Sequence, residues 1–313
     1  LEVKAYRDTW GRGLDGYVNW LAETVAILRD CLSPKGSIFV HLDHHVSHYA
    51  KAILDESFGV GMFQNEIVWR RKGGSALGEM GRLSVATDYI LWYAKGDAYT
   101  FLPPREMPSG DYIEQNFSRV DENGRRFQAT VMRSPSPRPN LKYDYKGYKT
   151  PPNGWSVPRA TMEELDASGY LHFPEDKSRQ IYKKIYLDEY PGQVANNLWA
   201  DIATLKGRNV EILDYRTQKP EALLERILNM CSRPGDLVLD CFAGSGTTAA
   251  VAEKLGRRWI TADLGRFAIH TTRKRLLAIS DVKPFVVQNL GKYERQAWQS
   301  AEFGEDAESR QAA

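Results

Sequence analysis

The sequence predicts a protein of the α/β class, and two observations carry this prediction. From residue 219 onward, short apolar runs alternate with amphipathic stretches, which is the order of parallel strands joined by crossover helices. One of these strands leads directly into DCFAGSGTT at 240–248, a glycine turn of the kind where open parallel sheets bind ligands. With 313 residues, 42% of them hydrophobic, the chain can bury the core of one large domain or two smaller ones.

Composition narrows the class of protein further. The formal net charge is only +2, so a nucleic-acid surface would require local clustering of Lys and Arg. The three cysteines form no CxxC pair and favour a reducing cytoplasm over a disulfide scaffold. The sequence shows no signal peptide, and no apolar run approaches the roughly 18 residues of a membrane helix. We therefore expect a cytoplasmic protein with no membrane partner.

Residues 1–96 read as a first α/β part. Val18, Leu21 and Val25 fall on one face of an expected helix, which a proline and a glycine end before residue 37. The elements expected next are a strand at 37–43, a helix at about 44–57, and two β-rich runs at 65–71 and 87–95 that form a hairpin around the glycine-rich loop 72–81.

Residues 97–199 differ in composition, because they hold most of the prolines and many tyrosines. Eight basic residues lie between positions 125 and 159 against one acidic residue, a local balance of +7. Cations can neutralise phosphates while rings stack on bases, but a solvated loop region with a few buried rings has the same composition. The interleaved residues are Arg125, Arg126, Phe127, Arg133, Arg138, Lys142, Tyr143, Tyr145, Lys146, Tyr148, Lys149, Trp155 and Arg159.

Residues 200–292 return to α/β order, and residues 293–313 read as a polar tail. The alternation implies parallel strands with the glycine turn at the carboxyl end of one of them. The expected elements are helices at 219–230, 247–256 and 266–280 and strands at 236–240, 258–263 and 284–290.

The acidic residues near the glycine turn discriminate between ligands. Gly244 and Gly246 fit a dinucleotide fingerprint, and Asp263 follows at a distance that suits a ribose contact. Asp240, however, would repel a pyrophosphate and attract a cation. S-adenosylmethionine, a nucleoside with an ammonium and a sulfonium, suits both carboxylates. ATP is disfavoured since GxxxxGK[ST] does not occur, while a nicotinamide-linked oxidoreductase and a plain strand-to-helix connection stay open.

The order of the motifs along the chain is also informative about its family. TQKP at 217–220, DCFAGSGTT at 240–248 and ITADL at 260–264 follow the basic, tyrosine-rich middle, and HLD and NEIVWRR precede it. In this order the chain, over about residues 6–298, resembles the β-class amino-methyltransferases of DNA in restriction–modification systems, above all the adenine-specific branch with its Mod subunits. The resemblance implies a Rossmann-like, S-adenosylmethionine-dependent methyltransferase fold with an inserted target-recognition region at 97–199.

The resemblance also implies an activity and partners. We expect methyl transfer from S-adenosylmethionine to the exocyclic amino group of adenine in double-stranded DNA, after the base has been flipped out of the duplex. A restriction subunit is a second possible partner. An N4-cytosine methyltransferase and a non-catalytic DNA-binding relic or partner subunit remain alternatives.

Site residues follow from the matching motifs. The expected loop around the methionine part of the cofactor consists of Asp240, Phe242, Gly244 and Gly246, with Thr247 and Thr248 at the helix start. Asp263 is expected to bind the ribose, and Thr217, Gln218, Lys219 and Pro220 to close over the cofactor, with Lys219 meeting its carboxylate. The expected DNA-binding residues are Arg70, Arg71, Arg125, Arg126, Arg133, Arg138, Lys142, Lys146 and Lys149.

One family motif is absent from the sequence. Asp-Pro-Pro-Tyr, which carries the family's chemistry, does not occur, and the Pro-Pro pairs at 103–104 and 151–152 lack its flanks. We expect this motif upstream of Leu1, on a strand between the one that ends at Asp240 and the one that ends at Asp43. Without that strand, the fragment should be poorly stable and inactive, because buried backbone groups lose their partners.

The run HLDHHVSHY at 41–49 raises the alternative of a metal site. His44 and His48 share a helix face, as zinc ligands do, but the glutamate of HExxH is absent. We expect no metal. Cys241, which follows Asp240, is expected to be a small buried residue rather than a reactive thiol.

Overall fold

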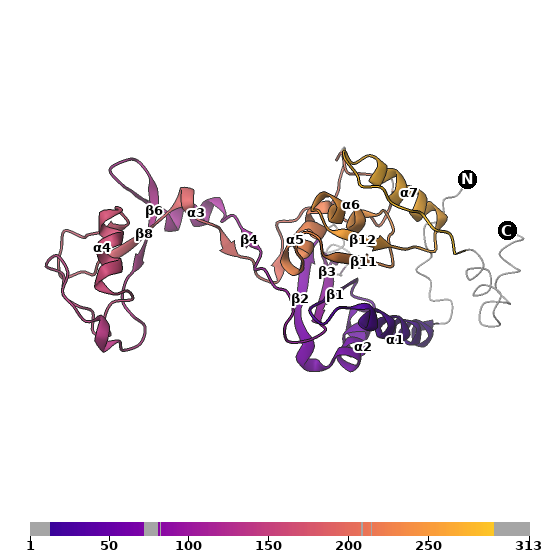
Figure 1. The fold of residues 1–313 in the computed structure, drawn as a ribbon, viewed down its shortest axis with the longest axis horizontal. Helices are drawn as coiled ribbons and strands as arrows, with labels where there is room; N and C mark the ends of the chain where they lie inside the picture. Colours follow the sequence, from indigo (N-terminus) through magenta and orange to yellow (C-terminus); the bar gives the residue numbers. More distant parts are fainter. Residues whose placement is uncertain (1–12, 72–80, 82, 208, 214, 291–313) are drawn as a thin grey trace, which may run out of the picture. The chain divides into compact units, whose positions relative to one another are not determined.

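The computed structural model describes residues 13–71, 81, 83–207, 209–213 and 215–290. The chain forms two compact units. We call Leu1–Pro104 together with Asn196–Ala313 the split unit, and Arg105–Ala195 the middle unit. Figure 1 labels the helices and strands of both units. Within the described residues, no helix is both long and apolar enough to cross a membrane.

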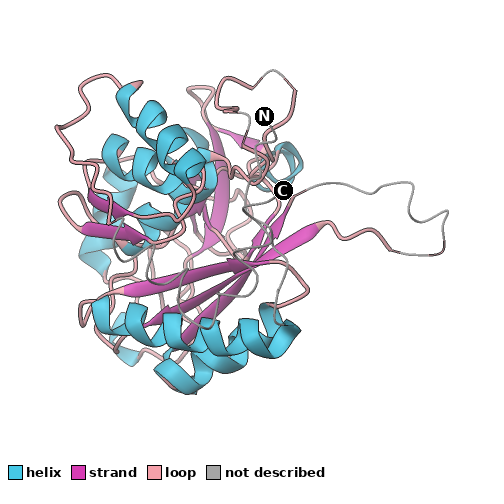
Figure 2. Ribbon diagram, turned by 90° about the vertical axis from the view of Figure 1, so that its right-hand side faces the viewer, coloured by secondary structure: helices cyan, strands magenta, loops and turns pink. Residues whose placement is uncertain are grey.

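The larger sheet of the split unit confirms the predicted hairpin. Antiparallel pairing joins β3 (Thr87–Ala94) to both β1 (Ser37–Leu42) and β2 (Phe63–Arg70), and β10 (Leu198–Trp199) runs parallel to β2. The strand order is β1-β3-β2-β10. A short 3-10 helix η1 (Val60–Met62) precedes β2. Helices cover the sheet (Figure 2).

Alternation along β3 explains how both faces of this sheet are buried. Leu91 and Tyr93 point into a core formed with α1 (Gly13–Cys31) and α2 (Ser47–Phe58), while Ile90 and Trp92 join a second core with α5 (Glu221–Cys231). Because successive side chains of a strand face opposite sides, one apolar strand supplies two cores. β3 therefore packs against the N-terminal helices on one face and against the C-terminal third of the chain on the other.

The smaller sheet of the split unit carries the glycine turn. Its strands β11 (Leu237–Asp240) and β12 (Arg258–Thr261) are parallel, with Asp240 opposite Thr261. The crossover is α6 (Thr247–Lys254), and α7 (Arg266–Leu277) follows β12. Parallel strands joined by a helix are what the alternating pattern predicted. Leu237 and Leu239 of β11 remain 54% and 45% exposed.

The strand predicted at 284–290 was wrong. The described chain has no strand there, and Val286 and Val287 are 80% and 51% exposed. The start of this segment is held by Lys283 N–H, which donates to Glu253, and by Phe285, which packs on Trp259. An apolar run without a ladder partner does not form a strand, and sequence cannot show whether a partner is present.

The middle unit is built on an antiparallel sheet of order β5-β6-β8-β7. Trp155, Met162 and Ile181 are fully buried in its core. The strands are β5 (Arg119–Val120), β6 (Arg126–Val131), β7 (Leu171–His172) and β8 (Tyr182–Tyr186); β4 (Arg105–Glu106) pairs with β9 (Gln193–Val194). The helices are α3 (Gly110–Asn116) and α4 (Arg159–Ala167), with 3-10 turns η3 (Pro139–Leu141) and η4 (Leu187–Glu189).

The middle unit is shorter at both ends than the segment 97–199 expected from composition. Trp199 is buried beside Trp69 in the core of the split unit, and its strand pairs with β2. Leu102 N–H donates to the carbonyl of Met230, also in the split unit. Proline and tyrosine content locates the insertion, but the packing of these flanking residues sets its limits.

Candidate functional site

The turn between β11 and α6 has the predicted strand-turn-helix geometry. Gly244 and Gly246 adopt φ of +52° and +73°, in the left-handed region that favours glycine. A Cβ on Gly246 would lie 2.7 Å from the Thr272 side chain on α7, closer than packed atoms approach. A Cβ on Gly244 would lie 3.5 Å from the ring of Tyr215. Gly246 therefore lets the backbone approach α7, and Gly244 lies in contact range of the Tyr215 ring.

Two carboxylates end the adjacent parallel strands at this turn. Asp240 closes β11 and accepts a hydrogen bond from Phe242 N–H at 3.0 Å. Asp263 follows β12 and accepts from Gly244 N–H at 2.9 Å and from Gly265 N–H at 2.7 Å. A carboxylate offers about four acceptor sites, so two bonds leave Asp263 able to accept more. The structure thus brings both predicted acids to the edge of the smaller sheet.

The segment 217–220 lies against the same turn. Thr247 Oγ1 donates to the carbonyl of Lys219 at 3.2 Å. Gln218 is used inside the protein, since its amide donates to the carbonyl of Glu211 and accepts from Leu213 N–H. Pro220 caps α5, and the Lys219 ammonium donates to the carbonyl of Thr217 at 3.2 Å. Sequence motifs separated by twenty residues therefore meet at one place.

Arg275 on α7 supports the turn and was missed by the sequence reasoning. It is only 7% exposed, and its guanidinium donates to Thr247 Oγ1 at 2.9 Å and to Glu221 at 2.8 Å. Lys254 also donates to Glu221. Burial raises the pKa of Glu221, but the bonds from these two cations outweigh it and leave that pKa below its ordinary value. The helical spacing of Arg275 with the buried Ala268 and Thr271 was the available signal.

The hydroxyl of Thr247 is therefore committed to the protein's own structure. It donates to Lys219, accepts from Arg275 and lies 3.0 Å from Ser245 Oγ. Thr248, the neighbouring residue in the predicted set, is half-buried in the same first turn of α6. Thr247 anchors residues 217–220 to the turn.

Aromatic side chains surround the turn. Phe242 is 54% exposed and meets the ring of Trp20 on α1 edge-on, with centroids 5.8 Å apart. Tyr215 stacks on Phe267 at 5.7 Å. The predicted set contained only Phe242, because Trp20 lies far away in sequence and Tyr215 precedes the quoted motif by two residues. The rings give the turn an apolar rim.

Arg70 and Arg71, predicted to bind DNA, close the end of β2. Arg70 donates to the carbonyl of Ala200 at 3.2 Å. Arg71 Nε lies 3.0 Å from the buried Asp88 carboxylate, which also contacts His41 Nε2 at 3.0 Å. The Arg71 contact lacks the alignment of a hydrogen bond and is an ion pair. Burial lowers the pKa of His41, and the bond to Asp88 offsets this only in part.

The predicted histidine cluster lies on an exposed turn. Ligand atoms of Asp43, His44 and His45 fall within 4.8 Å of one another. The Asp43 carboxylate already accepts bonds from the N–H and Nδ1 of His45, as in an ordinary Asx turn. We therefore keep the prediction of no metal, and His48 lies apart from this group on α2.

Most of the aromatic residues predicted to stack on bases lie in the core of the middle unit. Of the rings proposed for stacking, Phe127, Tyr145, Tyr148 and Trp155 are all buried, and Tyr143 donates its hydroxyl to the carbonyl of Val157. The alternative of buried rings was right for these side chains, because a small unit needs its large rings for the core. The exposed groups of this segment that could meet phosphates include its cations.

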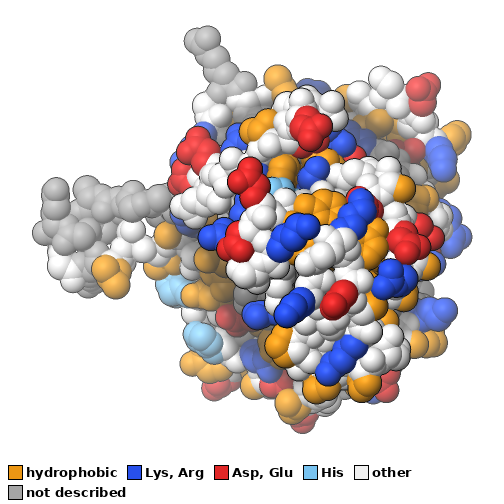
Figure 3. Space-filling model, turned by 90° about the vertical axis from the view of Figure 1, so that its left-hand side faces the viewer, with side chains coloured by type: hydrophobic (Ala, Val, Ile, Leu, Met, Phe, Trp, Pro, Cys, Tyr) orange, Lys and Arg blue, Asp and Glu red, His pale blue; other side chains and the backbone are white. Residues whose placement is uncertain are grey.

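The predicted cations of the middle unit fall into two groups. Arg125 bonds Asp188 and Glu189, Arg126 donates to backbone carbonyls of α3 and its C-cap, and Lys146 pairs with Asp166. Figure 3 shows the same mixture of basic and acidic side chains on the face it presents. Within the described residues, the side chains of the other group make no ion pair; these are the exposed Arg133, Arg138, Lys142 and Lys149.

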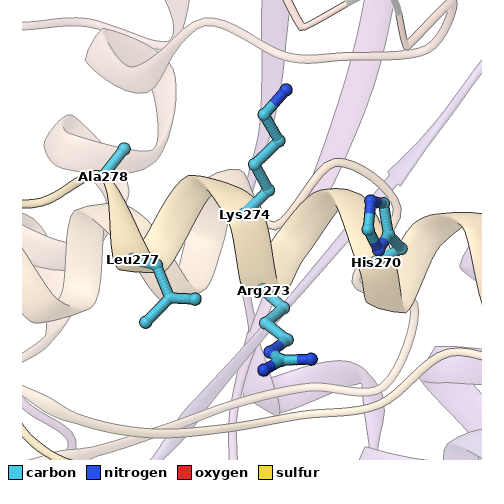
Figure 4. A pocket seen from close by; sticks show the side chains of 5 residues that line it. All are labelled: His270, Arg273, Lys274, Leu277 and Ala278. Atoms are coloured by element: carbon cyan, nitrogen blue, oxygen red, sulfur yellow. The ribbon is translucent and has the colours of Figure 1, made fainter.

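A hollow of about 330 Å³ lies along α7 and is not part of this site. It is lined by His270, Arg273, Lys274, Leu277 and Ala278 (Figure 4). These residues occupy the exposed side of α7, whereas Thr272 and Arg275 on the other side contact the glycine turn. Its volume alone does not show that it binds a ligand.

Comparison with known proteins gives relatives of one kind. A Type II methyltransferase, M.EcaI of Enterobacter cloacae, is 30% identical over 83% of this chain and 57% of its own length. The StyLTI Mod subunit of a Type III restriction-modification enzyme of Salmonella typhimurium is 31% identical over 74% of this chain and 37% of its own. The chain spans about half the length, or less, of these curated relatives.

A solved structure and a family model complete the comparison. The crystal structure of the M1.HpyAVI–SAM complex aligns with a TM-score of 0.42 at 18% identity, covering 84% of this chain and 82% of that one. The family model for DNA methylases, N6_N4_Mtase, matches residues 7–274. The family model covers most of the chain, so the chain belongs to this family of DNA methylases.

Proposed function

We propose that the protein transfers a methyl group from S-adenosylmethionine to the N6 amino group of adenine in double-stranded DNA. The observation that carries the proposal is the pair of carboxylates, Asp240 and Asp263, at the ends of two adjacent parallel strands around a glycine turn. Two acids at this position suit a cationic nucleoside and would repel a pyrophosphate.

The residues at the turn fit such a cofactor. Asp263 retains acceptor capacity for ribose hydroxyls, and Gly244 lies in contact range of the Tyr215 ring. In the proposal Asp240 attracts the ammonium of the cofactor, Lys219 meets its carboxylate, and Phe242 packs against it. S-adenosylmethionine supplies an electrophilic methyl on its sulfonium. The chain's own residues bind and orient the cofactor and exclude water from it.

The proposal includes a strand that this sequence does not contain. Among the described residues, β1 pairs only with β3 and β11 only with β12, and apolar side chains of β11 are exposed. These features support a strand with Asp-Pro-Pro-Tyr between β11 and β1, as the family resemblance implies. Its Asp side chain and Pro carbonyl would hold the amino nitrogen of the flipped base. We propose that the chain does not catalyse methyl transfer without this strand.

Two alternatives remain for the activity. The target could be the N4 amino group of cytosine, since the first residue of the absent motif discriminates between the bases. A non-catalytic DNA-binding subunit, with or without a restriction partner, is favoured by the same absence of Asp-Pro-Pro-Tyr. In all three cases the middle unit, with its basic residues, is proposed to bind DNA.

Two measurements separate these functions. Isothermal titration with S-adenosylmethionine of protein expressed with the reading frame upstream of Leu1 tests the cofactor site, and no binding would overturn it. Protein expressed with the reading frame upstream of Leu1 is then given tritiated cofactor and unmethylated DNA. Label on adenine supports the proposal, label on cytosine supports the first alternative, and cofactor binding without transfer supports a non-catalytic subunit.

A further inference from the structure

The four exposed cations of the middle unit are not equally placed. Three of them, Arg133, Arg138 and Lys142, belong to one loop, residues 133–142, which contains no acidic residue. Lys149, the fourth, lies near Asp144 and helps to lower the pKa of that carboxylate, after the bonds from Thr150. The loop 133–142, which we call the proline loop, thus concentrates uncompensated positive charge.

The proline loop is firmly tied to the core of the unit. Ser134 N–H donates to the carbonyl of Gly154 at 3.0 Å, Arg138 N–H to that of Asn153 at 2.8 Å, and Trp155 N–H to that of Leu141 at 2.9 Å. Trp155 is fully buried, so it anchors one side of the loop. Gly154 allows this approach, because its φ is +88° and a Cβ there would lie 2.7 Å from the carbonyl oxygen of Arg138.

Prolines stiffen the same loop. Pro135, Pro137 and Pro139 alternate along it, and each fixes its own φ and restricts the residue before it. A rigid loop loses little backbone entropy when its cations meet a ligand, so binding is weakened less by ordering. Fixed, unpaired cations on such a loop suit the regularly spaced anions of a nucleic-acid backbone.

We propose that the proline loop is the element of the middle unit that contacts DNA phosphates, through Arg133, Arg138 and Lys142, and that Arg125, Arg126 and Lys146 are structural. This inference rests on the proposed function, since it assumes that DNA is the partner. It narrows the proposed DNA contacts of the middle unit to one loop, in place of the prediction that all of its basic residues contact DNA. Phosphate contacts set the position of the protein on the duplex without reading its sequence.

The test is the salt dependence of binding of the full chain to a fluorescent DNA duplex. Each phosphate contact contributes about −0.9 to the slope of log K against log salt. R133Q/R138Q should therefore make the slope about 1.8 less negative, and R133Q/R138Q/K142Q about 2.7 less negative. The matched control is K177Q/R179Q, which removes two exposed cations from a loop balanced by Glu175 and Asp176. This control should keep the wild-type slope.

The outcomes separate the inference from the function beneath it. A wild-type slope in the triple variant, or an equal loss in the control, would overturn the assignment while DNA binding stands. Binding that falls equally for unrelated duplex sequences agrees with phosphate contacts, and a loss confined to one sequence would contradict them. A wild-type chain without salt-dependent DNA binding would remove the DNA partner itself, and with it this inference.

Discussion

The glycine turn of the split unit and the basic segment of the middle unit were both expected to be functional, yet the structure uses their residues differently. At the turn, Asp240 and Asp263 end adjacent parallel strands, and Gly246 takes a left-handed conformation close to α7 that favours glycine. In the basic segment, residues of one type serve as ion-pair partners, as donors to helix carbonyls or as exposed charges. A backbone requirement can be read from sequence, whereas the use of a charge cannot.

The largest expected effect tests whether the turn depends on close approach. Gly246→Ala should lower the free energy of unfolding by about 2–5 kcal/mol, the sum of left-handed strain and overpacking against Thr272, and should abolish cofactor binding. Gly169→Ala in the middle unit is the control, because its φ is +75° but nothing lies within 4 Å of the added Cβ. It should cost only about 1–2 kcal/mol in urea unfolding. Equal costs would show that the contact with Thr272 is unimportant.

A second substitution asks whether Asp263 binds ligand or only braces the turn. Asp263→Asn should weaken S-adenosylmethionine binding by about 1.5–3 kcal/mol, because charge-assisted bonds to the ribose are lost. Asp236→Asn is the matched control, since Asp236 also accepts a backbone N–H, from Arg233, but at the opposite end of β11. Calorimetry should find wild-type affinity in the control. Unchanged affinity in Asp263→Asn would place the ribose elsewhere.

The buried histidine predicts a smaller, pH-dependent effect. The pKa of His41 is lowered from 6.5, chiefly by burial, so below about pH 6.5 the unfolded chain binds a proton that the folded protein does not. The free energy of unfolding should therefore fall as the pH drops from about 6.5 toward the folded pKa. His41→Gln should flatten this part of the pH profile of urea unfolding.

His172 in the middle unit provides the comparison. Burial and then the charges of Arg119 and Lys184 lower its pKa in the same direction. His172→Gln should leave the pH dependence of the split unit unchanged, as measured by the fluorescence of the buried Trp69 and Trp199. A profile that flattens in His172→Gln but not in His41→Gln would reverse the assignment.

The smallest effect is expected at Arg125. Its ion pairs with Asp188 and Glu189 are largely exposed, so Arg125→Gln should leave the free energy of unfolding almost unchanged. It should also leave the salt slope of DNA binding unchanged. A slope lowered by about 0.9 would mean that Arg125 contacts a phosphate despite its partners.

Sequence alone predicted those elements whose cause is local. The parallel pair β11 and β12, the hairpin of β2 and β3, and the turn with Asp240 and Asp263 all follow from periodicity and glycine placement. Arg275 and Trp20 could not be assigned, because their roles depend on contacts with residues far away in the chain. The absence of the predicted strand at 284–290 and the burial of the rings in the middle unit could not be predicted for the same reason, because both depend on contacts with distant residues.

The antiparallel pair of β4 and β9 has a consequence for how such proteins diversify. Arg105 lies opposite Val194 and Glu106 opposite Gln193, so the chain enters and leaves the middle unit through two strands held side by side. An insertion with adjacent ends places little demand on the host fold. The segment can thus be exchanged or lengthened between related proteins without disturbing the fold of the split unit.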